Sequence, residues 1–580
     1  MFSSTYQRIS LARLIGMLVL MLTFICTLFG NTSADIYAAV AELEDLVFLE
    51  QRLLNASKNF ISSERRKLAN LKQFAEAVEV ASKLSSGNPE EYVANPINSY
   101  LLLKRFTWGW KELGSLLNLS DEKLKDIDTI LKVSKNSLPT YDEDFVGAAA
   151  GLFRLQETYA IPAREMSEGK IKGTKPSLHK LTAADCYELG ELAYKNDKYV
   201  QMLEWLEEAE RLRLTNATLG QERIGNLSIV LLFEHLSWAY YISGNYKKAL
   251  YYTEQALKHN TSDPTMENNA KYYKSVIKMQ QEGNRVTQTS YQFDYKQNVI
   301  GNKEFYNSTY ARACRGVFLN NHTRPRDHRK IRCFYKRDSP RLLLKPVKVE
   351  CVHDNPEVYI LYDVINQKEI DFIKSLAKPK LTFAKAYDDF GKMVTANYRI
   401  CKSCGSLMSP NHFVSFQQSR STQLMYSWLF YEDTPLQLHD QLKSLDRRCA
   451  DVSGLSIDSA EELQVVNYGI GGQYEFHKDH GEKGAPLDVH KDGNRIATLL
   501  FYLSDVEAGG ETVFTKAGLS LKPKKGDAAF WFNLHRNNTG DWRTEHASCP
   551  VVSGSKWVMN KWFHMRGNDQ RRPCTLKQLD

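Results

Sequence analysis

Apolar residues recur at three- and four-residue steps along the first third of the chain, interleaved with Glu, Lys and Arg, which is the pattern of amphipathic helices. The longest run extends from about Ala41 to Leu84, and further helical runs follow from Leu101 to Val133 and from Asp144 to Thr158. The first run suits an ordinary bundle helix and a coiled-coil dimerisation arm equally well. We therefore predict a helical N-terminal dimerisation domain over residues 35–165.

A second helical pattern, between Thr182 and Tyr273, contains two segments that can be laid over each other. Small residues at the expected helix crossings, a Gly-x-Tyr turn and a terminal Pro are typical of tetratricopeptide repeats, whose paired helices stack around a concave groove. We predict such a domain over residues 170–280. Most of its aromatic residues would be core, but they outnumber what so small a unit needs to bury, and flat rings suit a polyproline-II peptide. The candidates for peptide binding are Tyr194, Tyr199, Trp238 and Tyr241.

The chain from residue 281 to 355 is polar and basic, which favours a solvated linker. Beyond Val358 the pattern changes to short strands separated by turns that contain Gly or Pro. The predicted strands are Leu463 to Tyr468, Ile496 to Leu503, Glu511 to Phe514, Asp527 to Phe532 and Lys556 to Phe563. Their spacing predicts a jelly roll, or double-stranded β-helix, in a domain spanning 356–580 with its core at about 460–566. The fold class is therefore multidomain α + β.

Composition narrows the class of protein. A chain of 580 residues with 43% hydrophobic residues has room for about three or four domains, which excludes wholly disordered, collagenous and polytopic membrane proteins. The net charge of +8 is small for this length and is not gathered into the basic stripe of a nucleic-acid binder. No nucleic-acid partner is expected.

The N-terminus and the cysteines indicate the secretory pathway. The apolar run from Leu14 to Phe29 follows two Arg residues and precedes small residues that end at Ala34, which predicts a signal peptide over residues 1–34; the alternative is a signal anchor. We expect no membrane span after cleavage. Of the ten cysteines, nine remain once Cys26 is removed, enough for several disulfides. Eight Asn-x-Ser/Thr sequons follow, at Asn55, Asn118, Asn216, Asn226, Asn260, Asn307, Asn321 and Asn537.

The residues that suggest chemistry begin with His477-Lys-Asp479, just after the glycine-rich turn at 469–472. Strand alternation places the imidazole and the carboxylate on one face, and His546 on a later strand is the candidate third ligand. Two His and one carboxylate leave one face of an octahedral ion open, as in non-haem Fe(II) oxygenases. His-x-Asp alone is a weak signal. With the later His, the Lys ten residues beyond it and the intervening strands, it becomes a strong one.

With these residues in view, the chain from about Leu43 onward resembles the catalytic α subunit of collagen prolyl 4-hydroxylases, which are Fe(II)- and 2-oxoglutarate-dependent dioxygenases. The order of helical arm, aromatic repeat unit and jelly roll is also that of the family. The blocks that carry the resemblance are 461–469, 471–475, 493–498, 501–505, 509–510, 523–526, 546–550, 556–557 and 560–562.

The resemblance implies a role for each site residue. His477, Asp479 and His546 would hold the iron, and Lys556 would pair with the distal carboxylate of 2-oxoglutarate. Since an unpaired buried carboxylate is costly, a buried lysine is the chemistry this cosubstrate needs. The remaining matches are Tyr468 and Thr498, which could hydrogen-bond the cosubstrate, and His564, which would assist its binding and turnover.

The resemblance also implies the reaction and its setting. The product would be 4-hydroxyproline in X-Pro-Gly sequences of procollagen or another proline-rich secreted chain, with succinate and CO2 as co-products and L-ascorbate to rescue oxidised iron. Two α subunits would assemble with two copies of protein disulfide isomerase, which would hold the complex in the endoplasmic reticulum lumen, since the last four residues here are not a retention signal. The implied disulfides are Cys314 with Cys333 and Cys549 with Cys574.

Two departures from the family pattern keep alternatives open. Phe476 and His480 replace the usual Pro and aromatic residue, although His480 should point to the opposite face from Asp479. A stretch from about Cys404 to Ser427 looks inserted and is either a surface loop or a segment that the mature message lacks. One alternative is therefore a non-catalytic, proline-rich-peptide-binding or chaperone-like subunit. Another is a prolyl 3- or lysyl hydroxylase, although these usually carry Arg where Lys556 stands.

Overall fold

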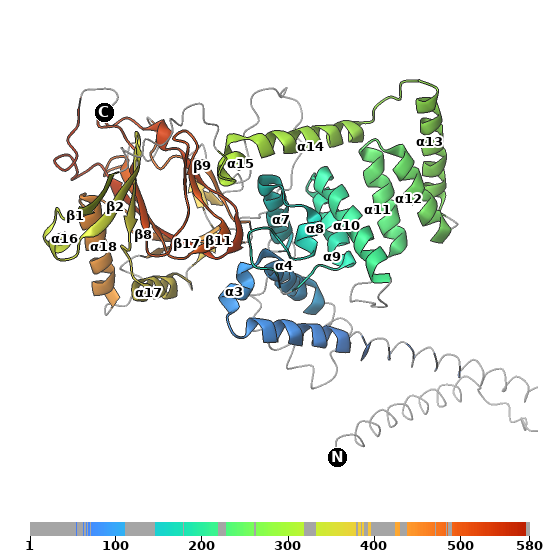
Figure 1. Cartoon of the computed structure of the whole chain (residues 1–580), viewed down its shortest axis with the longest axis horizontal. Helices are drawn as coiled ribbons and strands as arrows, with labels where there is room; N and C mark the ends of the chain where they lie inside the picture. The colour runs from blue at the N-terminus through green and yellow to red at the C-terminus, as the bar shows by residue number, and fades with distance from the viewer. Residues whose placement is uncertain are drawn as a thin grey trace, which may run out of the picture. The chain divides into compact units, whose positions relative to one another are not determined.

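A computed structural model describes residues 71–110, 145–217, 228–259, 263–317, 332–378, 438–482 and 490–575 with isolated gaps, together with scattered positions at 54–69 and strand backbones between 381 and 429 (Figure 1). It divides into two units, residues 1–75 and 76–580. The predicted signal peptide, most of the 41–84 helix and most of the 404–427 stretch lie outside the described residues. Among the helices that are described, none is both long and apolar enough to cross a membrane.

The N-terminal half of the larger unit is helical, as predicted. Asn88 and Asn95 accept backbone hydrogen bonds at the starts of two short helices whose first residue is Pro. Thr182 and Asp185 form a capping box at the start of a longer one. The helices are α3 (Pro89–Ala94), α4 (Pro96–Lys104), α7 (Val146–Tyr159), α8 (Ala163–Ser167), α9 (Ala183–Lys195), α10 (Tyr199–Ala217), α11 (Ile229–Ile242), α12 (Tyr246–His259) and α13 (Pro264–Gln281).

One apolar core joins α4 and α7 to the paired helices α9 to α13. Trp205 of α10 is fully buried in it and donates its indole N–H to the side-chain oxygen of Gln156 on α7 at 2.8 Å. A buried indole usually finds such a partner, because its N–H is a strong donor. The N-terminal helices therefore pack against one end of the repeat helices.

The segment from 281 to 355, expected to be a solvated linker, is instead largely ordered. It contains α14 (Ser290–Asn307), α15 (Thr309–Cys314), β1 (Arg332–Lys336), α16 (Pro340–Leu344) and β2 (Val347–Asp354). The linker prediction was wrong because it was based on polar composition, and these helices and strands are polar since much of the segment lies on the surface. The buried residue of the 18-residue helix α14 is the polar Gln292, so this helix gives no apolar pattern in the sequence.

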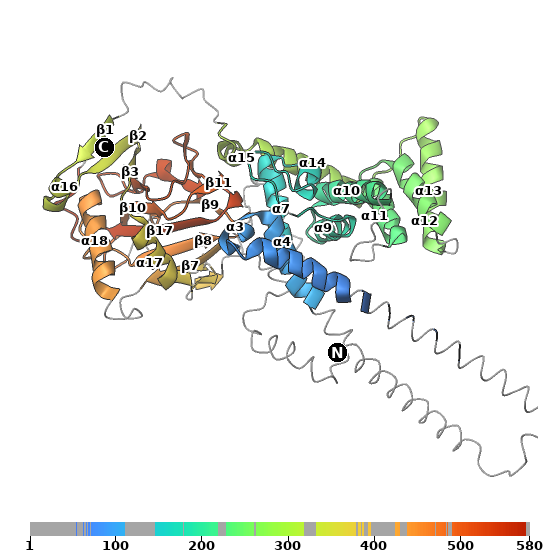
Figure 2. The same ribbon diagram turned by 60° about the horizontal axis from the view of Figure 1, so that its bottom comes forward.

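The C-terminal part is a two-sheet sandwich, which confirms the predicted jelly roll (Figure 2). The large sheet has the order β1-β2-β3-β14-β10-β17-β8-β7-β4, and the small sheet has the order β13-β12-β15-β9. The remaining strands of the large sheet are β3 (Glu357–Tyr362), β4 (Thr382–Phe383), β7 (Leu424–Leu429), β8 (Leu463–Tyr468), β10 (Arg495–Tyr502), β14 (Ala528–Phe532) and β17 (Lys556–His564). Those of the small sheet are β9 (Tyr474–His477), β12 (Thr512–Phe514), β13 (Leu519–Leu521) and β15 (His546–Ser548).

Smaller pieces complete this part of the chain. Two further pairs of strands are β5 (Lys385–Tyr387) with β6 (Met393–Thr395), and β11 (Val506–Gly509) with β16 (Val551–Gly554). Two helices, α17 (Gln367–Ala377) and α18 (His439–Ser453), share an apolar core with the large sheet. All five strands predicted from the sequence are present, with ends that differ by a single residue at most.

Alternation along the central strand β10 separates two environments. Ala497, Leu499 and Phe501 pack in the core shared with α17 and α18, whereas Leu500 and Tyr502 pack toward the small sheet. Because side chains alternate across a sheet, Thr498 belongs to the second face. The interior between the two sheets is therefore where polar residues of β10 and β17 can meet those of β9 and β15.

The helical part contacts the sandwich through buried polar bonds. Arg154 of α7 donates to the carbonyl oxygen of Gly471 at 2.5 Å, and the Tyr159 hydroxyl donates to that of Pro550 at 2.7 Å. Both acceptors lie in the turns that flank β9 and β15. The strands of the small sheet are thus held from outside the sandwich as well as from within it.

The disulfides implied by the family resemblance are not the one observed. Cys314 of α15 is bonded to Cys549, which follows β15, while Cys333 and Cys574 are exposed free thiols. The pairings Cys314 with Cys333 and Cys549 with Cys574 are therefore wrong for this structure. The reason is that α15 packs on the small sheet, where Cys314 and Cys549 share one small apolar core, whereas Cys333 lies on the edge strand β1.

We expect peptide mapping of the unreduced protein to recover a cross-linked pair of peptides containing Cys314 and Cys549. Thiol labelling before reduction should modify Cys333 and Cys574, because both are exposed. The Cys333→Ser variant is the matched control, and it should leave the cross-link intact. Recovery of Cys314 linked to Cys333 in the mass spectrum would contradict the observed pairing.

Candidate active site

Backbone pairing brings together two histidines that are far apart in the sequence. His477 ends β9, His546 begins β15, and the two residues are direct partners in the antiparallel ladder. Asp479 follows two residues after His477. Ligand atoms of His477, Asp479 and His546 all lie within 4.8 Å of one another, which makes the three a candidate metal site. The structure therefore assembles the trio that the sequence predicts.

Hydrogen bonds to the backbone orient both imidazoles. Nδ1 of His477 lies 2.7 Å from the carbonyl oxygen of Glu475, and Nδ1 of His546 lies 3.0 Å from that of Thr544. Since a carbonyl oxygen can only accept, each Nδ1 must carry the proton. Each Nε2 is then a lone-pair donor and lies 3.7 Å from a carboxylate oxygen of Asp479. This is the tautomer that a divalent metal requires.

Asp479 is the buried charge of the cluster. Only 4% of its surface is exposed, and it accepts a hydrogen bond from the Thr498 hydroxyl at 2.7 Å. Thr498 is itself bonded to Asn533. Burial alone would raise the pKa of Asp479, but His546, His477 and Arg495 lower it below the usual value. The group is therefore ready to ligate as a carboxylate. Thr498, predicted to contact the cosubstrate, is placed on the metal-site carboxylate.

Aromatic rings close one side of the cluster. Tyr474 stacks on His477 with ring centroids 3.6 Å apart, and Trp531 meets the His546 ring edge-on at 4.8 Å. His477 is the most exposed member of the trio. His480 is buried outside the cluster with Nδ1 toward the carbonyl of Gly481, so it is not a member, as expected.

Lys556 is a fully buried amine in the same interior. Its Nζ lies 2.5 Å from the Ser548 hydroxyl and 4.6 Å from the ring centre of Tyr468, its partner in the β8–β17 ladder. Burial lowers the pKa of Lys556 to about 7, against the opposing effect of Glu511. A carboxylate bound beside it would restore the charge, because an adjacent anion favours the protonated amine. The residue therefore suits the distal carboxylate of a dicarboxylic acid.

His564 is not directed at the metal cluster. Its Nε2 lies 3.0 Å from Glu461, and its Nδ1 contacts the carbonyl oxygen of Gly493. Glu461 is also paired with Arg495. Despite burial, these partners lower the pKa of Glu461 to about 2. The structure thus places His564 in a buried ion-pair network beside the site, and its predicted catalytic role stays a prediction.

The predicted peptide-binding residues fall into two aromatic groups on the repeat helices. Tyr194 and Tyr199 face each other across the α9–α10 turn with ring centroids 6.2 Å apart. Trp238 and Tyr241 of α11 lie 5.4 Å apart. The second group also includes Tyr272 of α13 and Tyr291 of α14, both more than 40% exposed. Part of each group is therefore available to a ligand.

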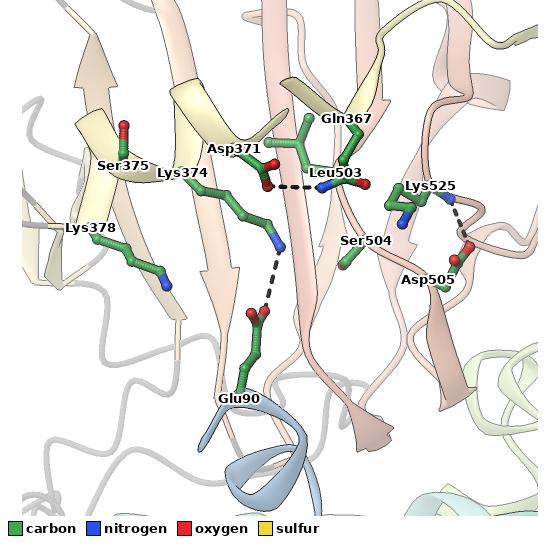
Figure 3. Close-up of a pocket in the computed structure, with 10 residues that line it drawn as sticks. All are labelled: Glu90, Gln367, Asp371, Lys374, Ser375, Lys378, Leu503, Ser504, Asp505 and Lys525. Atoms are coloured by element: carbon green, nitrogen blue, oxygen red, sulfur yellow. Dashed lines mark hydrogen bonds and ion pairs between the residues drawn. The ribbon is translucent and has the colours of Figure 1, made fainter. Parts of the chain in front are cut away.

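A separate hollow of about 440 Å³ lies between α3, α17 and the loop after β10 (Figure 3). It contains no member of the metal cluster. Lys374 is paired with Glu90 at 3.4 Å, and Asp505 accepts a hydrogen bond from the backbone of Lys525. Because charges of both signs line it and several are already paired, it shows no preference for a charged ligand. The remaining lining residues are Gln367, Asp371, Ser375, Lys378, Leu503 and Ser504.

Comparison with known proteins agrees with this geometry. Residues 39–173 match the family model of the prolyl 4-hydroxylase alpha-subunit N-terminal region, residues 183–279 the prolyl 4-hydroxylase peptide-substrate-binding domain, and residues 463–564 the 2OG-Fe(II) oxygenase superfamily. Prolyl 4-hydroxylase subunit alpha-1 of Gallus gallus is 35% identical over 94% of this chain and 100% of its own length. The chain belongs to the prolyl 4-hydroxylase α-subunit family.

Other relatives support the same assignment. Subunit alpha-1 of Caenorhabditis elegans is 35% identical over 95% of this chain and 92% of its own length, and subunit alpha-2 of Gallus gallus is 34% identical over 95% and 97%. The predicted family and fold class are confirmed. This α subunit is an enzyme, a prolyl 4-hydroxylase that uses Fe(II) and 2-oxoglutarate, and the donor set of two imidazoles and one carboxylate fits Fe(II).

Several supporting residues of this prolyl 4-hydroxylase site were not singled out from the sequence. Ser548 stands two residues after His546, so strand alternation already places it on the same face. Asn533 gives no such signal, because it meets Thr498 only after β14 has paired with β10. The Glu461 and Arg495 pair likewise depends on pairing between distant strands.

We expect Thr498→Val to weaken divalent metal binding by about 10- to 100-fold, the usual cost of losing a hydrogen bond to a metal ligand. The substitution keeps the shape of the side chain and removes the hydroxyl that orients Asp479. Titration with Zn²⁺ against a chromogenic chelator measures the affinity. The exposed Thr265→Val variant is the control, and equal affinities in the two variants would show that the hydroxyl has no role at the metal.

Proposed function

We propose that this prolyl 4-hydroxylase α subunit hydroxylates C4 of proline in X-Pro-Gly sequences of procollagen or a similar proline-rich secreted chain. The observation that carries the proposal is a His-Asp-His trio between two sheets with a fully buried Lys556 in the same interior. With O2 as the oxidant, Fe(II) and 2-oxoglutarate would supply the chemistry: one oxygen atom enters succinate as CO2 leaves, and the other enters the C–H bond of proline.

The chain's own residues would hold and orient the reactants. His477, Asp479 and His546 would occupy one face of the iron, leaving the other for the cosubstrate and O2. Lys556, with Ser548 and Tyr468 around its amine, would pair with the distal carboxylate of 2-oxoglutarate. Tyr474 and Trp531, which pack on His477 and His546, would exclude water from the metal site. Excluding water suppresses side reactions.

The peptide would be held by the repeat helices. The partly exposed rings of Tyr194, Tyr199, Trp238 and Tyr241 suit proline rings, because a polyproline-II peptide loses little entropy on binding. The second aromatic group is the better candidate, since Tyr272 and Tyr291 extend it. Binding away from the metal would raise the local concentration of prolines at the site.

The setting of the enzyme is part of the proposal. The predicted signal peptide, the sequons and the cysteines support residence in the endoplasmic reticulum lumen. The relatives are named as α subunits, which supports assembly with a second subunit, and protein disulfide isomerase is the partner we propose, in an α2β2 tetramer. L-Ascorbate would reduce iron that is oxidised in unproductive turnovers.

We expect His546→Ala to abolish hydroxylation and to leave peptide binding unchanged, because the metal ligand and the aromatic groups lie on different domains. The assay incubates (Pro-Pro-Gly)n with the full chain co-expressed with protein disulfide isomerase, Fe(II), 2-oxoglutarate, ascorbate and O2, and measures oxygen gain by mass spectrometry. His259→Ala, at the exposed end of α12, is the control. If the unmodified protein bound the peptide without oxygen gain, the non-catalytic binding subunit would be the better reading.

We expect Tyr241→Ala to weaken the binding of a proline-rich peptide roughly tenfold, the scale for an aromatic residue at the centre of an interface. The affinity for 2-oxoglutarate should not change. Calorimetric titration of each ligand measures both, with the exposed Tyr335→Ala on β1 as the control. Unchanged peptide affinity would remove Tyr241 from the binding surface.

A further inference from the structure

A single phenol reaches from the helical part of the chain to both strands that carry the metal-site histidines. Tyr310 of α15 has 7% of its surface exposed, and its hydroxyl donates to the side-chain oxygen of Gln473 at 2.8 Å. The same hydroxyl lies 3.4 Å from the carbonyl oxygen of Ser548. Gln473 immediately precedes β9 and Ser548 ends β15, so Tyr310 contacts the two ligand-bearing strands at one point.

That point is an irregularity in the ladder between the strands. His546 pairs with His477, but Ser548 pairs with Tyr474, so two residues of β9, Glu475 and Phe476, lie opposite one residue of β15, Ala547. Such a bulge bends the strand and leaves backbone groups without their ladder partners. The one proton of the Tyr310 hydroxyl is donated to Gln473 at 2.8 Å, and the Ser548 carbonyl oxygen at 3.4 Å makes a weaker contact with the same hydroxyl. The bulge thus has a partner from outside the sheet.

From this point, short contacts lead to the groups that bind the metal and the cosubstrate. Gln473 donates to the Glu475 carboxylate at 3.3 Å, and the carbonyl of Glu475 is the acceptor that orients His477. On the other strand, Ser548 holds the Lys556 amine. The Tyr310 ring also packs edge-on against Phe476, the neighbour of His477, with centroids 5.3 Å apart.

We propose that Tyr310 is a positioning residue for the metal centre: by donating to Gln473 and contacting the Ser548 carbonyl beside the bulge, it keeps His477 and His546 in register around Asp479. In this proposal Tyr310 acts through the two strands. The inference rests on the proposed function in one respect, namely that the His-Asp-His trio is the iron site.

A purely structural role is the competing explanation, because the Tyr310 ring shares an apolar core with Ala313, Val513 and Ala547. The two roles depend on different parts of Tyr310. Packing of the core depends on the ring, whereas the register of the strands depends on the hydroxyl. Tyr310→Phe keeps the ring and removes only the hydroxyl, so it tests the positioning role with little change in packing.

The experiment titrates the full chain, purified in its assembled form, with Co²⁺ as a redox-stable substitute for Fe(II), and records the visible ligand-field spectrum and the affinity. Tyr310→Phe should bind Co²⁺ about 10- to 100-fold more weakly, the range for residues that orient metal ligands, and should shift the spectrum. In the hydroxylation assay with Fe(II), the KM of Tyr310→Phe for the peptide should stay unchanged, because the aromatic groups on α9 and α11 are intact.

Tyr306→Phe is the matched control, since Tyr306 lies four residues away on α14, and its ring stacks under Arg315. It should bind Co²⁺ as the unmodified protein does. Gln473→Leu should also weaken Co²⁺ binding, and the double variant should lose less affinity than the two single losses combined, because both substitutions remove the bond between Tyr310 and Gln473. If Tyr310→Phe does not fold, Gln473→Leu still tests whether loss of the bond between Tyr310 and Gln473 weakens Co²⁺ binding.

Two results would overturn the inference. One is a folded Tyr310→Phe protein with the affinity and spectrum of the unmodified chain, and the other is an equal loss in Tyr306→Phe. Failure of the proposed function looks different. In that case, His546→Ala would bind Co²⁺ as well as the unmodified chain, or the unmodified chain would bind Co²⁺ at the trio without hydroxylating the peptide.

Discussion

A carboxylate buried between two sheets is the constraint on which the rest of this structure depends. Asp479 is almost fully buried, and an isolated charge there would be lost to protonation. It stays ionised because a threonine hydroxyl donates to it and because Arg495 and, when they are protonated, the two facing imidazoles attract it. These groups come from three strands, β9, β10 and β15. The sandwich must therefore close around Asp479 before the site exists. A bound divalent metal ion would then stabilise the buried carboxylate with its two positive charges.

The buried lysine poses the same problem with the opposite sign. Lys556 lies on β17 of the large sheet, its amine contacts a hydroxyl and an aromatic ring, and the charge of Glu511 only partly offsets its burial. Burial weakens its hold on a proton, as the lowered pKa shows. A bound dicarboxylate would relieve this cost, so the protein would exchange stability for affinity at this position. The iron ligands and the lysine come from different sheets, and a two-sheet fold is what lets one ligand reach both.

Contacts from the helical part show that the sandwich is not a self-sufficient site. Arg154, Tyr159 and Tyr310 all bond to backbone or side-chain groups at the ends of β9 and β15. The small sheet has only short strands, which form few ladder bonds of their own. External donors therefore add to the bonds that hold the strands carrying His477 and His546.

Sequence alone determined the repeat helices, the five strands predicted for the jelly roll and the identity of the trio. Periodicity located the helices and strands because burial of one face imposes a local repeat, and His477-Lys-Asp479 is a local motif whose two ligands need only strand alternation to meet. The tertiary structure decided what depends on distant pairing: the Cys314–Cys549 bond, the placement of Thr498 on Asp479, the Glu461 network around His564, and the contact of Tyr310 with both strands. These contacts have no local signature, because they form only when strands and helices far apart in the chain pack against each other.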